Sequence, residues 1–298
     1  MINLLFSIFL ATLAVVGGIL WLRLLKNPVD FTVRNFPQPF GLVDLVICFA
    51  AVLLVPGILA ASLVQLFGAE SAAALNDVQR NVLLITLALS QIVLAIVTIG
   101  ISVLRYGPAS KFFGIQAADL RGNLLLAAKT FAMVIPPLLL MQLLLSLIDP
   151  YEHDTLSDLK ERFTLPTITI NWFGAVIAAP FCEEVLFRGY LQGWMQRINF
   201  ALREDPVIEL GGGWPISDFE TSTRGKGQFE WWFPIIVSSA FFAAVHIGQG
   251  LAPIPLFFFG LALGFLYRYS GSIVPCIILH FLLNAMSMSK ATLDIAVQ

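Results

Sequence analysis

The chain has 298 residues, of which 58% are hydrophobic and only 12% are charged, and its formal net charge is −2. A soluble domain carries about 25% charged residues, so this composition excludes an ordinary cytosolic protein and a disordered chain. The slightly acidic balance gives no basis for binding nucleic acid. Three cysteines, each in an apolar stretch, make no disulfide framework. We therefore expect an all-α polytopic membrane protein that contacts the lipid bilayer and has no nucleic-acid partner.

Eight apolar segments are candidates for membrane-spanning helices, because a bilayer core about 30 Å thick needs about 20 apolar residues in a helix. In chain order they run over residues 3–25, 41–67, 81–104, 122–148, 169–192, 233–249, 253–269 and 272–290. The first lacks a basic region before its apolar run, so we expect a mature helix and not a cleavable signal peptide. The sixth and seventh are short and meet at a turn-prone junction, so they form either two short spans or one broken pair.

Two polar stretches interrupt these segments. Residues 149–168 carry five acidic side chains, and we expect them to form a short solvated helix. Residues 197–232 form a long polar insertion that contains three consecutive glycines and ends in two tryptophans, which suits a loop at the membrane interface.

The distribution of Lys and Arg predicts the orientation in the membrane. If all eight segments cross, eleven basic residues lie in loops on one side and four on the other. Basic loops stay in the cytoplasm. We therefore expect both termini to face away from the cytoplasm.

Two adjacent carboxylates, Glu183 and Glu184, lie inside the fifth apolar segment. An acidic residue at mid-membrane costs roughly 2.5–3.5 kcal/mol, so such residues mark functional sites. Neighbours in a helix point about 100° apart. Glu184 can pair with Arg188 one turn later, which leaves Glu183 as the free group. Pro180 is expected to weaken the helix one turn earlier and to open room near the acids. The alternative is that the whole cluster is an ion-paired contact between helices.

Two of the three histidines also lie in apolar segments. Phe242 and His246 are one turn apart in the sixth segment, and His280 and Asn284 are one turn apart in the eighth. Polar groups this costly face the bundle interior or a water-filled cavity. We therefore expect these side chains to converge with Glu183.

The chemistry open to such a set is narrow. Cys182 has no nucleophile-elbow spacing around it, and no His-Glu-x-x-His pattern is present. A carboxylate and a histidine can activate water, and a second histidine with an asparagine can donate to an oxyanion, which together describe amide hydrolysis. Alternatively, Glu183, His246 and His280 could hold zinc with an open fourth position. The residues alone leave both open.

Three short motifs carry a family resemblance. They are Glu-Glu-x-x-x-Arg at 183–188, Phe-x-x-x-His at 242–246 and His-x-x-x-Asn at 280–284. In this order, each on an apolar segment, they resemble the motifs of the CPBP family. These are the CAAX-processing and bacteriocin-processing intramembrane proteases, also called the Abi or type II CAAX prenyl endopeptidase family. The resemblance covers about residues 110–290, and the insertion 197–232 departs from the family's short connection between the first two motifs.

The resemblance implies a role for each motif residue. Glu183 and His246 are expected to activate water, while His280 and Asn284 form the oxyanion site. The supporting residues are Glu184, Arg188 and Phe242. In this interpretation no cofactor is required, although such proteins are often labelled metalloproteases and zinc remains the alternative.

The expected domains are the N-terminal transmembrane helices over 1–110 and a catalytic membrane domain over 111–298. The resulting hypothesis is an intramembrane endopeptidase of the bacterial inner membrane that cleaves peptides or lipidated peptides, including prenylated CAAX-type substrates. Two rivals come from other classes. A non-catalytic scaffold or bacteriocin self-immunity protein would need none of the motif residues. A proton-coupled transporter with a Glu/His relay would show inverted repeats, and the sequence has none.

Overall fold

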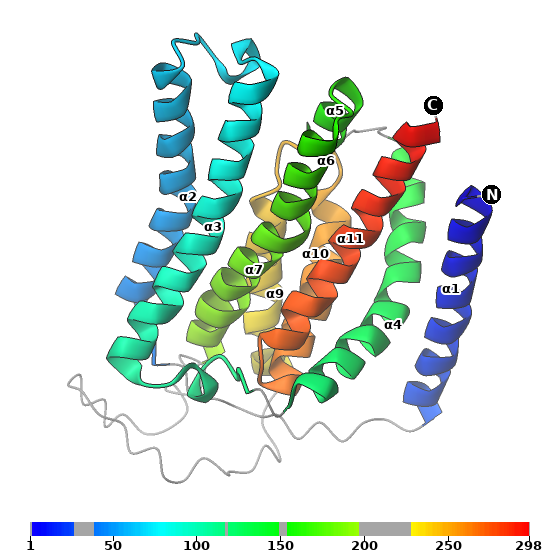
Figure 1. Cartoon of the computed structure of the whole chain (residues 1–298). Coiled ribbons are helices and arrows are strands. Elements are labelled where there is room, and N and C mark those ends of the chain that lie inside the picture. The colour runs from blue at the N-terminus through cyan, green and yellow to red at the C-terminus, as the bar shows by residue number, and fades with distance from the viewer. Residues whose placement is uncertain (1, 27–38, 117–118, 149–153, 197–227, 298) are drawn as a thin grey trace.

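The computed structural model describes residues 2–26, 39–116, 119–148, 154–196 and 228–297, and this part of the chain contains helices and loops but no strand. The expected polytopic helical bundle is confirmed (Figure 1). Within the described ranges, six helices are long and apolar enough to cross a membrane. They are α1 (Ile2–Lys26), α2 (Leu42–Leu66), α3 (Asp77–Tyr106), α4 (Leu120–Ser146), the composite helix Leu165–Gln196 and α11 (Val274–Val297).

The two remaining predicted spans correspond to α9 (Gln228–Ala244) and α10 (Pro253–Ser270), which pack closely against each other. At 1.5 Å per residue they are about 26 and 27 Å long, against about 45 Å for α3. The prediction of a helix over 233–249 is wrong at both ends, since α9 begins and ends earlier. The helix cannot continue to residue 249, because Gly248 and Gly250 have φ values of 105° and 54°, which are incompatible with a helix.

α9 also bears on the predicted insertion 197–232. The last five residues of the predicted insertion, 228–232, belong to α9. The rest of it, residues 197–227, lies outside the described residues.

The helices form one bundle in which α2 and α3 lie on one flank and α4 and α1 on the other (Figure 1). The composite helix, α9, α10 and α11 lie between these flanks. α1 begins and α11 ends at the same end of the bundle (Figure 1). This arrangement is the one that an even number of crossings requires, while the end that faces the cytoplasm stays a prediction.

α1 is attached to α4 at a double proline. Pro136 and Pro137 lie inside α4 and have no N–H, so the carbonyls four residues before each lose their helical donors. Trp21 Nε1 donates to one of them, the Met133 oxygen, at 3.0 Å. Gly17 approaches the other so closely that an added Cβ would lie 2.0 Å from the oxygen. Only 6% of the α1 span is buried, so this contact with α4 is one of the few that hold the helix against the bundle.

The short helix α5 (Asp154–Glu161) lies at the end of the bundle where the termini are (Figure 1). It is not the solvated helix that we expected, since Asp158 and Leu159 are both buried. Asp158 lies 3.0 Å from Arg80 Nε and 2.5 Å from Arg162 Nη2. These two arginines offset the charge of the acid, which allows one face of α5 to dock on the bundle.

Candidate active site

The first motif lies on a helix that departs twice from α-helical geometry. The composite helix consists of α6 (Leu165–Trp172), a π-helix η4 (Phe173–Ala178), α7 (Ala179–Glu184), a second π-helix η5 (Val185–Gln192) and a final α-helical turn over residues 193–196. η4 ends two residues before Pro180, where the sequence predicts a weakened helix. π-helical turns widen a helix and are frequent at functional sites. The two glutamates therefore lie on a short α-helical segment between two π-helices.

Glu184 is fully buried and has two partners. Its Oε2 lies 3.2 Å from Arg188 Nε, close enough for an ion pair although the atoms are not aligned as a hydrogen bond. The predicted Glu184–Arg188 pair is therefore present. His280 Nδ1 donates to the other oxygen, Oε1, at 2.8 Å. A carboxylate can only accept, so this bond places a proton on Nδ1 and fixes the orientation of the ring.

Glu183 points to the opposite edge of the same imidazole. Its Oε2 lies 3.8 Å from Nε2 of His280, and its side chain is 24% exposed. Its carboxylate also interacts electrostatically with His246. The two neighbouring glutamates thus face different surroundings, as their helical spacing predicts, and Glu183 is the one that is partly exposed.

His246 lies in the turn after α9 and not on the predicted helix. Its Nδ1 donates to the backbone carbonyl of Phe242 at 2.8 Å. Because a carbonyl can only accept, Nδ1 carries a proton, and Nε2 is an acceptor when the ring is neutral. This is the state that a general base requires.

The ring of Phe242 connects the parts of the site. It is fully buried, and its centroid lies 5.3 Å from the ring of His246 and 5.7 Å from that of His280. The guanidinium of Arg188 stacks on the ring at 4.7 Å, in a cation–π contact. The second motif is thereby packed directly against the first and the third.

Asn284, one turn after His280, donates from Nδ2 to the backbone oxygen of Ala175 at 2.8 Å. Ala175 belongs to η4. One N–H of the amide is therefore committed to the composite helix. The second N–H stays available to another acceptor, because an amide NH₂ has two donors.

The arrangement does not favour the zinc alternative. A zinc site needs three ligands directed at one point. Within the described part of the chain, no three His, Cys, Asp or Glu side chains are arranged to hold a metal ion. Whether the protein uses a metal stays a prediction.

The sequence analysis did not predict two hydrogen bonds that join the composite helix to α10 beside the site. Arg188 Nη2 donates to the Gly260 oxygen at 3.2 Å, and Gln192 Nε2 donates to the Gly264 oxygen at 2.8 Å. Added Cβ atoms would lie 3.0 Å from Ser239 at Gly260 and 2.9 Å from Gln192 at Gly264. The available signal was the Gly-x-x-x-Gly spacing, which marks close helix packing in membranes.

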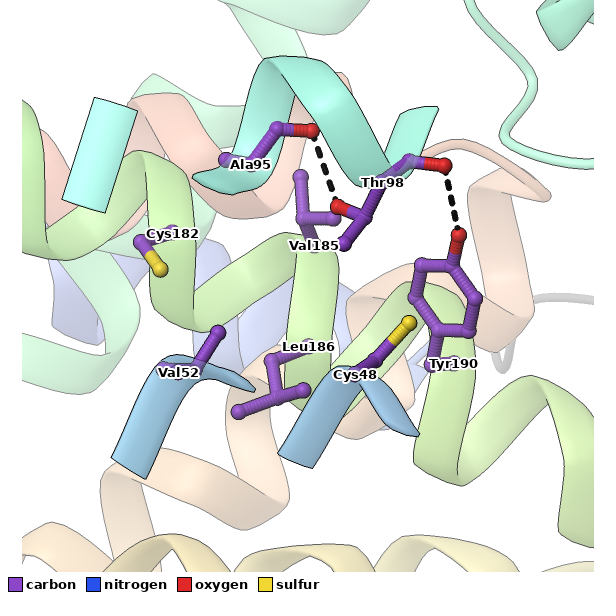
Figure 2. Close-up of a pocket in the computed structure, with 8 residues that line it drawn as sticks. All are labelled: Cys48, Val52, Ala95, Thr98, Cys182, Val185, Leu186 and Tyr190. Atoms are coloured by element: carbon purple, nitrogen blue, oxygen red, sulfur yellow. Dashed lines mark hydrogen bonds between the residues drawn. The ribbon is translucent and has the colours of Figure 1, made fainter. Parts of the chain in front are cut away.

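A small cavity lies behind the first motif, on the side of α2 and α3 (Figure 2). Its volume is about 10 Å³, and its lining includes Cys48, Thr98, Cys182 and Tyr190. The Tyr190 hydroxyl donates to the Thr98 carbonyl at 2.9 Å. Cys182 faces this cavity, whereas Glu183 faces His280. The expectation that Cys182 is not a nucleophile therefore has a geometric basis.

The fold and site together define a polytopic membrane protein in which carboxylates, imidazoles and an amide from separate helices meet inside the bundle. Comparison with protein families gives a match over residues 165–286 to the family described as type II CAAX prenyl endopeptidase Rce1-like. This range contains all three motifs, and the match confirms the resemblance to this family. Comparisons with curated proteins and with solved structures give no match. The match begins after α5, and the domain boundary at residue 110 stays a prediction.

Proposed function

We propose that the protein is an intramembrane endopeptidase that hydrolyses peptide bonds of membrane-associated substrates with activated water. The observation that carries the proposal is the placement of His280 between two glutamates. Glu184 orients the ring from Nδ1, and Glu183 faces Nε2 from a partly exposed position. The family match supports a protease in general, and the arrangement of the donors supports the use of water as the nucleophile.

Glu183 and His246 act on the water. Both present acceptors, so one water molecule can donate one hydrogen to the carboxylate and the other to Nε2 of His246. Glu183 takes a proton as the water oxygen bonds to the scissile carbonyl carbon. The same proton then passes to the leaving amine as the C–N bond breaks, which returns Glu183 to its carboxylate form.

His280 and Asn284 stabilise the oxyanion that forms on the substrate carbonyl. Asn284 offers its second N–H, and His280 offers Nε2–H when both ring nitrogens are protonated. Donors fixed in advance in a site of low dielectric are the strongest form of such stabilisation.

We further propose that the substrates are prenylated CAAX-type peptides, that the enzyme needs no metal, and that it resides in the bacterial inner membrane. The first point rests on the name of the matched family, and the second on the arrangement of the ligand side chains.

The test uses the full chain purified in detergent and a library of plain and farnesylated C-terminal Cys-a-a-X peptides, with and without a strong chelator. Wild type is expected to cleave farnesylated peptides, and Glu183→Gln to abolish cleavage while it keeps the size of the side chain. The matched control is Glu70→Gln, the same substitution at an exposed acid between α2 and α3. Cleavage by Glu183→Gln at the wild-type rate would contradict the mechanism. Loss on chelation with recovery on added zinc would contradict metal independence.

A further inference from the structure

Pro180 removes a backbone hydrogen bond of the composite helix close to Asn284. Within η4 the hydrogen bonds run between residues five apart, and the Ala179 N–H bonds the Gly174 oxygen in this register. The next carbonyl in the series, that of Ala175, would accept from the N–H of residue 180. Proline has none, so the Ala175 oxygen is left for a donor outside the helix.

Asn284 is that donor. Its Nδ2 lies 2.8 Å from the Ala175 oxygen, across the contact between α11 and the composite helix. The neighbouring residues hold the two helices together, since Val176 and Met288 are buried against each other with Ala285 packed on them. A carbonyl without a partner in an apolar bundle costs free energy, so this bond is not an optional contact.

The bond also determines where the rest of the amide points. A side-chain amide is planar, so committing one N–H to a fixed carbonyl leaves the second N–H in one direction. Without this anchor, the amide could turn about its side-chain torsions and no single orientation would be preferred.

We propose that Pro180 is a positioning residue for the oxyanion site: by releasing the Ala175 carbonyl, it anchors Asn284 and aims the second N–H of Asn284 at the substrate carbonyl. This inference rests on the proposed function. It concerns a residue that contacts neither water nor substrate. An alanine at position 180 restores the N–H, which competes with Asn284 for the Ala175 oxygen.

The experiment is a double-mutant cycle between Pro180→Ala and Asn284→Ala, measured in the full chain by kcat, by KM and by the midpoint of thermal unfolding in detergent. Asn284→Ala is expected to lower kcat about 10²–10³-fold, the cost of an oxyanion donor. Pro180→Ala is expected to lower kcat about tenfold to hundredfold with little change in KM, since misplacement of a catalytic group acts on the chemical step. In the Asn284→Ala background the same substitution is expected to leave kcat unchanged. Pro56→Ala, which removes a proline inside α2, is the matched control and should keep wild-type kcat.

A merely structural role for Pro180 gives a different pattern. If Pro180→Ala lowers kcat by the same factor with and without Asn284, or leaves the wild-type kcat unchanged, the proposal is overturned. Failure of the proposed function is read separately, from Glu183→Gln. Should no turnover be measurable, the unfolding midpoints still decide, because non-additive shifts establish the link between residues 180 and 284 and additive shifts refute it.

Discussion

Glu184 and Arg188 form a buried ion pair in which each side chain compensates the charge of the other. Both side chains have no exposure, and breaking such a pair from one side costs about 3–5 kcal/mol. We predict that Arg188→Met alone and Glu184→Gln alone each lower the free energy of unfolding by about this amount. The double substitution is expected to recover most of the loss, because it leaves no uncompensated charge. Chemical unfolding in detergent measures all three variants.

The control for this prediction is an exposed pair with the same spacing. Lys290 and Asp294 also form an ion pair four residues apart on a helix, but both side chains are exposed. Lys290→Met is expected to cost no more than about 1 kcal/mol. An equally large loss at both pairs would show that burial is not what gives the Glu184–Arg188 pair its importance.

Cys182 adjoins the catalytic glutamate in sequence but lies on the other side of the helix. It lines the cavity shared with α2 and α3 (Figure 2), so its thiol has no path to a substrate held at Glu183. We predict that Cys182→Ala keeps the wild-type kcat and that thiol-directed inhibitors do not act through this residue. The check is turnover on the farnesylated peptide with and without an alkylating reagent. A loss of kcat in a variant that remains folded would reopen the cysteine mechanism.

At the scale of elements, the packing of α10 depends on its two interfacial glycines. A Cβ at Gly264 would lie 2.9 Å from both Gln192 Oε1 and Ile235 Cγ2, so α10 would have to move away from the composite helix and α9. We predict that Gly264→Ala lowers the free energy of unfolding by about 1–3 kcal/mol, as overpacking does. Gly100→Ala in α3, where a Cβ meets nothing within 4 Å, is the control. It is expected to be neutral or stabilising by up to about 1 kcal/mol. The thermal unfolding midpoints of the wild type, Gly264→Ala and Gly100→Ala, measured in detergent, check both expectations.

The long helices could be predicted from the sequence because an apolar run of membrane length has one stable form in lipid. Their ends and partners could not, since these depend on single backbone hydrogen bonds. The contact between α1 and α4 is an example, because Trp21 is recognisable as a partner of Met133 only when the carbonyl freed by Pro137 is known to face α1. The end of α9 is another, since Gly248 and Gly250 allow a turn but do not say where it starts.

Within the site, one contact was predictable and others were not. The Glu184–Arg188 pair follows from helical spacing and is present. The bond from Asn284 to Ala175 depends on the π-helical register of η4, and no pattern in the sequence marks that register except the proline that ends it. The roles of Glu183, His246, His280 and Asn284 remain predictions, which the variants above test.

For the whole molecule, the orientation in the membrane decides from which side water and substrate reach the site. Loops with an excess of Lys and Arg remain in the cytoplasm. The described connection between α3 and α4, which carries Lys111 and is flanked by Arg105 and Arg121, lies at the end of the bundle opposite α5 and the termini (Figure 1). The three native cysteines are buried, so single cysteines added at exposed positions report the two sides on a low background. We predict that a membrane-impermeant maleimide labels Ser71→Cys, between α2 and α3, in intact cells. Gln116→Cys, between α3 and α4, should label only after permeabilisation, because its loop is expected in the cytoplasm. The reverse labelling pattern would contradict the predicted orientation. It would place the α9–α10 turn, which bears His246, on the cytoplasmic side.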